Sequence, residues 1–84
     1  MKTVAELKRN LTVGTVLTMT WHAFGAPKIV GIARTIQAVK SFGIEIGEGR
    51  SRLEWPKTSE VQFFGEDQFT ILEDCKPLMS YRIG

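Results

Sequence analysis

The chain consists of short runs in which apolar and polar residues alternate, and each run ends at glycine, proline or charged residues typical of turns. Residues 15–22 show this pattern best, with Leu17, Met19 and Trp21 in one phase and two threonines, Val16 and His22 in the other. Successive side chains of a strand point to opposite faces, so each run predicts a strand with one face in the core. Further strands are predicted over residues 28–39, 42–46, 51–55, 61–64, 69–72 and 78–83.

The segments between these runs carry turn residues. Residues 23–27 contain glycine and proline, and residues 47–50 contain two glycines, which predicts a turn and then a mobile hairpin loop. Pro56 ends the strand before it, because proline lacks the amide hydrogen that a central ladder needs. A single tight turn is predicted at residues 57–59, before the next strand.

The strand predicted over residues 28–39 is long and is expected to bend. Ile32, Ile36 and Ala38 share one phase with Val30, but Arg34 falls among them. A bulge adds one residue to a strand and thereby changes which side chains share a face. We therefore predict a bulge near residues 31–35, which would restore the alternation.

The residues before the first strand predict a short helix. Thr3 and Glu6 have the spacing of a capping box, and Leu7 and Leu11 follow at helical spacing. The predicted helix covers about residues 3–11. So short a helix is unstable alone, so we expect its apolar stripe to pack on the sheet.

One helix and six or seven short strands are typical of a small antiparallel barrel or sandwich, and a barrel is favoured because closure removes exposed strand edges. With 84 residues the chain is long enough for one core only. We predict a single domain over residues 1–84, mostly β, with the helix at about residues 3–11 and a barrel at about residues 14–84. Its expected core consists of Leu17, Met19, Trp21, Ile32, Ile44, Leu53, Trp55, Phe63 and Ile71.

The segment Glu54-Trp55-Pro56-Lys57-Thr58-Ser59-Glu60-Val61 has the order strand, aromatic residue, proline, tight helical turn and short strand. This order resembles the end of SH3-like barrels, and the resemblance implies a small SH3-like barrel. In ligand-binding SH3 domains the proline and a tyrosine of the next turn line a groove for proline-rich peptides, whereas this turn has no aromatic residue. The Ala-Leu-Tyr-Asp-Tyr motif of the first strand is also missing. The whole chain resembles small uncharacterised proteins of Gram-positive phage and mobile elements, which implies no activity.

The composition argues against secretion and membrane insertion. No apolar run is long enough to span a membrane, and Glu6 interrupts the region where a signal peptide would be apolar. The single cysteine, Cys75, cannot form an internal disulfide, which suits a reducing compartment. We therefore expect a cytoplasmic protein that has no membrane partner.

The residues also argue against catalysis. Nucleophilic catalysis needs a nucleophile, a base and an orienting group, but the only histidine, His22, is more than fifty residues from Cys75. One histidine and one cysteine do not complete a metal shell, and no glycine-rich loop precedes a helix that would bind phosphate. We therefore expect no enzyme activity, no cofactor, no metal and no small-molecule substrate.

Charge is distributed unevenly along the chain. Residues 1–52 contain eight Lys or Arg against three Asp or Glu, whereas residues 53–84 contain three against six. The two halves can form a dipolar surface, or they can intermingle in a small barrel and cancel. The predicted partner-binding residues are the basic ones of the second strand and the hairpin: Lys28, Arg34, Lys40, Arg50 and Arg52.

These observations favour a non-catalytic β-barrel module that binds a protein partner through electrostatic complementarity. The alternative is a nucleic-acid-binding barrel, in which the same Lys and Arg residues would contact phosphates. Should the basic surface not bind, the next candidate is the acidic C-terminal segment around Glu66, Asp67, Glu73 and Asp74. Oligomeric state does not follow from the sequence.

Overall fold

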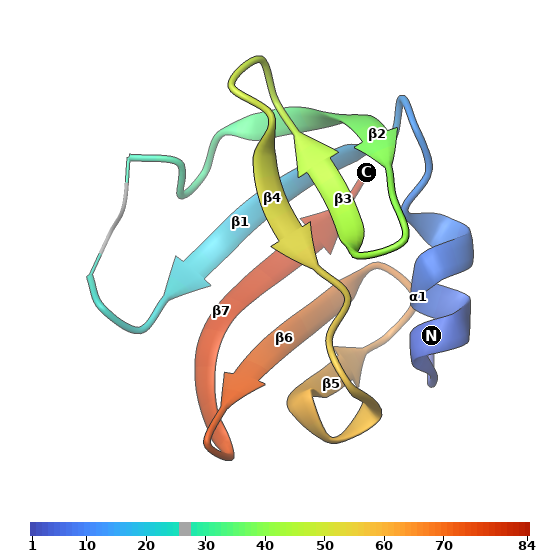
Figure 1. Cartoon of the computed structure of the whole chain (residues 1–84). Coiled ribbons are helices and arrows are strands. Elements are labelled where there is room, and N and C mark those ends of the chain that lie inside the picture. The colour runs from blue at the N-terminus through green and yellow to red at the C-terminus, as the bar shows by residue number, and fades with distance from the viewer. Residues whose placement is uncertain (26–27) are drawn as a thin grey trace.

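The computed structural model describes residues 1–25 and 28–84, and its described part is mostly β with one short helix (Figure 1). The prediction of a small, mostly β fold with an N-terminal helix is thus confirmed. The predicted turn at residues 23–27 lies partly outside the described residues, because Pro27 and its neighbour are not among them. The elements are α1 (Val4–Asn10), β1 (Val16–His22), β2 (Ala33–Val39), β3 (Gly43–Ile46), β4 (Ser51–Glu54), η1 (Thr58–Glu60), β5 (Val61–Phe64), β6 (Gln68–Glu73) and β7 (Lys76–Ile83).

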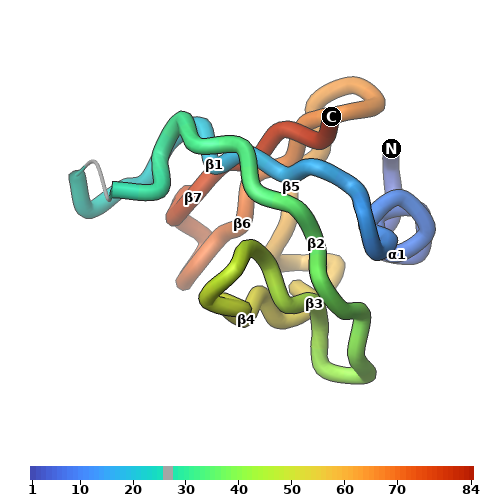
Figure 2. The backbone as a smooth tube through the Cα atoms, turned by 90° about the horizontal axis from the view of Figure 1, so that it is seen from above, coloured from blue at the N-terminus to red at the C-terminus, as the bar shows by residue number. Residues whose placement is uncertain are grey.

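All seven strands belong to one antiparallel sheet with the order β4-β3-β2-β1-β7-β6-β5. Neighbouring strands follow one another in the chain except for β1 and β7. Figure 2 shows the sheet curving, with β3 and β4 on one side of the molecule and β6 and β7 on the other. The sheet is not closed in the described part of the chain, because β4 and β5 remain its two edges. The predicted closed, SH3-like barrel is therefore not confirmed.

Helix α1 begins with one of the two hydrogen bonds of the predicted capping box. The hydroxyl of Thr3 accepts a hydrogen bond from the amide of Glu6 at 3.1 Å. Leu7 and Leu11 are both buried in the core of the sheet. The N-terminal ammonium group of Met1 donates to the carbonyl of Gly65 at 2.8 Å, which joins the helical end of the chain to the β5–β6 turn.

The core contains most of the side chains predicted for it. Of the nine predicted residues, five are buried and two more, Trp55 and Phe63, are partly buried against the core. Trp21 and Ile32 were predicted to be buried, but they are 46% and 51% exposed. The five buried residues are Leu17, Met19, Ile44, Leu53 and Ile71.

A β-bulge accounts for the exposure of Trp21. Met19 is paired with Tyr81 on β7, whereas Trp21 is paired with the next residue back, Ser80, so one residue of β1 is extra. Tyr81 and Ser80 are adjacent and point to opposite faces of β7. Met19 therefore faces the core with Tyr81, and Trp21 faces outward with Ser80.

The second strand is shorter than predicted and bulges at a different place. Ile32 precedes β2 and lies outside the sheet, which leaves its side chain exposed. The register of β2 against β3 shifts between Ile36 and Ala38, not near residues 31–35. Arg34 is instead paired with Leu17, and residues directly opposite one another share a face of the sheet. Arg34 therefore leaves the strand on the same side as a buried leucine.

Candidate functional site

The five basic residues predicted to bind a partner lie on four different parts of the structure. Lys28 is exposed in the connection between β1 and β2, Arg34 is half-buried on β2, and Lys40 is exposed just after β2. Arg50 and Arg52 lie together on the β3–β4 hairpin.

The two hairpin arginines already have partners within this hairpin. Nη1 of Arg50 lies 3.1 Å from Oε1 of Glu45. The guanidinium carbon of Arg52 lies 3.8 Å from the ring centroid of Phe42, which is close enough for a cation–π interaction. Both side chains remain exposed, so both guanidinium groups are accessible from solvent.

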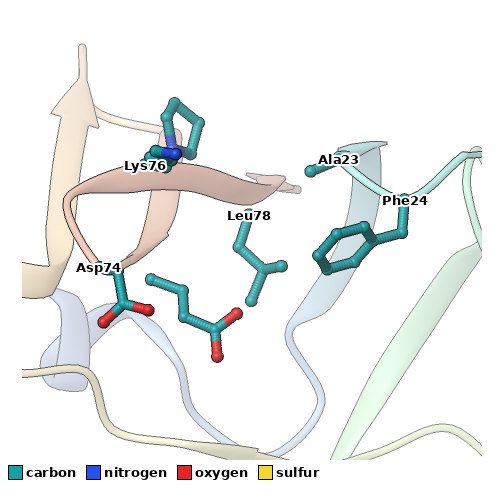
Figure 3. A pocket seen from close by; sticks show the side chains of 7 residues that line it. Ala23, Phe24, Asp74, Lys76 and Leu78 are labelled. Carbon is teal, nitrogen blue, oxygen red and sulfur yellow. The ribbon is translucent and has the colours of Figure 1, made fainter.

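The end of β1 and the β6–β7 turn enclose a hollow of about 340 Å³. Phe24 lines this hollow. This residue is 81% exposed, more than any other large apolar residue in the described part of the chain. Figure 3 shows the Phe24 ring and the Leu78 side chain pointing toward each other, with Asp74 on the far side of Leu78. Glu73 and Lys76 also line this hollow.

Local hydrogen bonds hold Phe24 in this position. The amide of Ala23 donates to the carbonyl of Leu78 at 2.8 Å, which extends the contact between β1 and β7 beyond the last strand residue. The amide of Phe24 donates to Nδ1 of His22 at 3.2 Å, and the two rings are 5.8 Å apart. His22 therefore orients the exposed phenylalanine in this structure.

A second hollow, of about 350 Å³, lies between β4 and the β6–β7 hairpin. Leu53 and Ile71 of the core and the partly buried Met79 line it, and Trp55 and Pro56 line it on the β4 side. It shares Glu73 and Leu78 with the first hollow, so the two hollows are adjacent. We call this pair of hollows the seam groove, because the second hollow separates the edge strand β4 from the β6–β7 hairpin.

Acidic side chains outnumber basic ones along the seam groove. Its two basic residues are Arg52 and Lys76, against four carboxylates. Two of these carboxylates belong to the acidic segment that the sequence named as the second candidate surface, whereas Glu66 of that segment pairs with the Met1 ammonium group at 3.2 Å. The four carboxylates are Glu54, Glu60, Glu73 and Asp74.

A third hollow, of about 300 Å³, lies on the outer face of the sheet between Trp21 and Phe64. Between these two aromatic residues lie Thr70 and Ser80, whose hydroxyl oxygens are 2.8 Å apart. The next outward-facing row of the sheet contains Arg82, paired with Gln68. This face thus combines exposed aromatic rings, hydroxyl groups and one arginine.

The described residues include His22 and Cys75, the two side chains weighed for catalysis in the sequence. They contain no group of three or more His, Cys, Asp or Glu side chains placed to hold a metal ion. Cys75 is exposed in the β6–β7 turn, and His22 accepts its hydrogen bond from the neighbouring Phe24 amide.

Sequence reasoning missed Phe24 and the seam groove. The one available signal was a large apolar residue within a segment of turn residues, beside Gly25. The groove brings Ala23 and Phe24 together with residues 52–79, so no local sequence pattern predicts it. No helix of the described residues is long and apolar enough to cross a bilayer. Comparison of the chain with family models, curated proteins and solved structures found no match.

Proposed function

We propose that the chain is a non-catalytic β module that binds a protein partner, and that the seam groove is its binding site. The observation that carries this proposal is the exposed Phe24 ring beside Leu78, in a hollow adjacent to one lined by core side chains. An exposed apolar surface with a polar rim is typical of interaction sites. Aromatic anchors at such sites commonly contribute much of the binding energy.

The charge of the groove supports one kind of partner segment. Four carboxylates against two basic groups favour a ligand with Lys or Arg next to apolar side chains. Apolar groups would contact Phe24, Leu78 and Met79, and the cations would lie near Glu73 and Asp74. We propose an apolar and basic segment of a protein as the ligand.

A selection from a random-sequence peptide library on the immobilised full chain tests this proposal. We expect enrichment of peptides that combine apolar residues with Lys or Arg. Phe24→Ala should weaken their binding by roughly tenfold or more, because burying a phenylalanine is worth about 1.5–3 kcal/mol. Phe64→Ala is the matched control, since Phe64 is also exposed but lies in the outer hollow.

Charge reversal supplies a second comparison. Glu73→Lys with Asp74→Lys should weaken the selected peptides and make their binding less sensitive to salt. Glu48→Lys is the matched control, because Glu48 is exposed on the β3–β4 hairpin and does not line the groove. Failure to enrich such peptides, or equal binding by the Phe24→Ala protein, would contradict the proposal.

The alternative function, nucleic-acid binding, is favoured by a different observation. Trp21 and Phe64 are exposed on the outer face around Thr70 and Ser80, and aromatic rings on a sheet can stack with bases. Titration with short single- and double-stranded DNA and RNA at two salt concentrations tests it. Steeply salt-dependent binding that is lost in Trp21→Ala would support this alternative over a protein partner.

We also infer that the fold is an open relative of the small SH3-like barrels. In support, β4 continues through Trp55 and Pro56 into η1, after which β5 begins at Val61, which is the order that the resemblance implies. The seam groove uses Trp55 and Pro56 but no aromatic residue of η1. The proposed ligand is therefore one that fits the acidic rim and Phe24, and it differs from the proline-rich peptides that SH3 domains bind.

A further inference from the structure

Arg34 has a polar atom that is buried and unpaired. Its Nε is the one side-chain nitrogen or oxygen that is buried without a hydrogen-bond partner in the described residues. No carboxylate of that part of the chain forms an ion pair with Arg34, whose charge is therefore not compensated at short range. Buried polar atoms nearly always have a partner, so an exception calls for a physical explanation.

The sheet places Arg34 where water is partly excluded. Its pairing with Leu17 directs the side chain to the core side of β2. The stem then passes over Gly47, where a Cβ atom would lie 3.3 Å from the Arg34 Cδ. Gly47 has a φ of +73°, which also favours glycine. The hairpin backbone and the arginine stem thus lie against each other.

An arginine in this position keeps its charge. The guanidinium does not deprotonate in proteins, so burial cannot be relieved by loss of a proton. A partly buried cation without a counter-charge lowers stability unless another group supplies negative charge or hydrogen-bond acceptors. The guanidinium presents several N–H donors in a plane, a geometry that matches the oxygens of a carboxylate or a phosphate.

A hollow of about 440 Å³ adjoins Arg34 and gives a ligand room to enter. It lies between the start of β2 and the β3–β4 hairpin, and Thr35 and Gln37 add polar groups to its lining. Glu48 also lines it, but Glu48 forms no ion pair with Arg34 in the described part of the chain.

We propose that Arg34 and this hollow form a binding site for an oxyanion, a carboxylate or phosphate group of a ligand, separate from the seam groove. The occupant accepts hydrogen bonds from the terminal N–H groups of the guanidinium and compensates the charge beside the buried Nε. Glu48 is the internal competitor, because it is the one carboxylate among the lining residues. This site depends on Arg34 alone among the basic residues that the sequence singled out.

NMR of the ¹⁵N-labelled full chain tests the proposal through the Arg34 Nε–H signal. The probes are sodium phosphate and sodium acetate, with sodium chloride at matched ionic strength as the control salt. We expect a saturable shift of this signal with phosphate, acetate or both, and none with chloride. Response to phosphate alone would assign a phosphate ligand, and response to acetate would assign a carboxylate.

Variants separate the site from general anion effects. Arg34→Gln should abolish saturable shifts of the Thr35 and Gln37 amides, whereas Lys40→Gln, at an exposed lysine just beyond β2, should preserve them. Glu48→Gln should strengthen the phosphate or acetate response severalfold, because the competing carboxylate is gone. The wild-type and Glu48→Gln titrations keep the test decisive even if Arg34→Gln folds poorly.

Tyr81 gives an independent readout, because it is the only tyrosine in the chain. Burial raises the pKa of Tyr81, and the positive charge of Arg34 opposes this rise. An anion on Arg34 should therefore shift the tyrosinate absorbance titration to higher pH, with folding monitored by circular dichroism at the same pH. The Arg34→Gln protein should titrate higher from the start and show no anion effect.

Two outcomes would overturn the proposal. One is the absence of a saturable Nε–H shift with both oxyanions in wild-type and Glu48→Gln proteins. The other is a large Nε–H shift caused by Glu48→Gln itself, without an oxyanion response in either protein, which would make Glu48 the solution partner of Arg34.

Discussion

Nη1 of Arg50 lies 3.1 Å from Oε1 of Glu45, so an arginine predicted to bind a partner forms an ion pair within its own hairpin. Glu45 is also directly opposite Arg52 in the pairing of β3 with β4. The positive charge of this hairpin is therefore partly balanced on the same face. Exposed pairs of this kind contribute little to stability, which makes them suitable for charge reversal.

Reversal of Arg50 and Arg52 to Glu distinguishes the two candidate surfaces. We expect the free energy of unfolding to change by about 1 kcal/mol or less, as for most surface substitutions, measured by urea denaturation. Peptides selected on the seam groove should bind at least as tightly, because Arg52 adds like charge to a groove for basic ligands. Weaker binding would instead support the basic surface predicted from the sequence.

Leu53→Ala tests the core at the open side of the sheet. Leu53 is buried on β4 beneath the second hollow, so its truncation should lower the free energy of unfolding by about 2–5 kcal/mol. Val39→Ala is the control, because Val39 is 44% exposed and should cost much less in the same denaturation series. Equal losses for the two variants would show that β4 does not pack as described.

The β6–β7 turn predicts different effects for two substitutions of Cys75. Asp74 and Cys75 have φ angles of 51° and 64°, as in a two-residue type I′ turn, where glycine is preferred at the second position. Cys75→Gly should therefore raise the free energy of unfolding by roughly 0.5–1 kcal/mol.

Cys75→Ser is the matched control, because serine keeps the strain and removes only an exposed thiol. Its melting temperature in reducing buffer should stay nearly unchanged, and a chelator should have no effect on the wild-type chain. A loss of many degrees in either experiment would show that the thiol or a bound metal supports the fold.

Tyr81 should make the fold sensitive to alkaline pH. Burial raises the pKa of Tyr81 above its ordinary value of 10.0, so the unfolded chain loses this proton at lower pH than the folded chain does. The contribution of this proton to the free energy of unfolding is complete at pH values below that ordinary pKa. It declines as the pH rises toward the folded pKa. Urea denaturation between neutral and alkaline pH should show the decline.

Tyr81→Phe is the control for this pH dependence. It removes the titrating group together with the hydrogen bond that the hydroxyl donates to Sδ of Met79 at 3.3 Å. The variant should lose stability less steeply with rising pH than the wild-type chain. Identical slopes would assign the alkaline decline to other groups.

Local patterns in the sequence were sufficient for those elements whose stability depends on near neighbours. The helix follows from the spacing of Thr3, Glu6 and Leu7, since a cap and an apolar stripe are local features. Leu53 lies inward and Arg52 outward because β4 is short and regular, so its period of two is not interrupted. Pro56 ends that strand for the same local reason, the missing amide.

Tertiary pairing decided the positions that carry the proposed functions. Trp21 is in phase with Leu17 and Met19 in the sequence, but the register of β1 against β7 changes between Met19 and Trp21 and exposes the ring. Arg34 faces the core side because Leu17 lies opposite it, and no feature of β2 alone predicts that partner. The seam groove joins β1, β4 and the β6–β7 hairpin. These contacts depend on which strands pair and where a bulge forms, and both follow from the free energy of the whole sheet and not from any one segment.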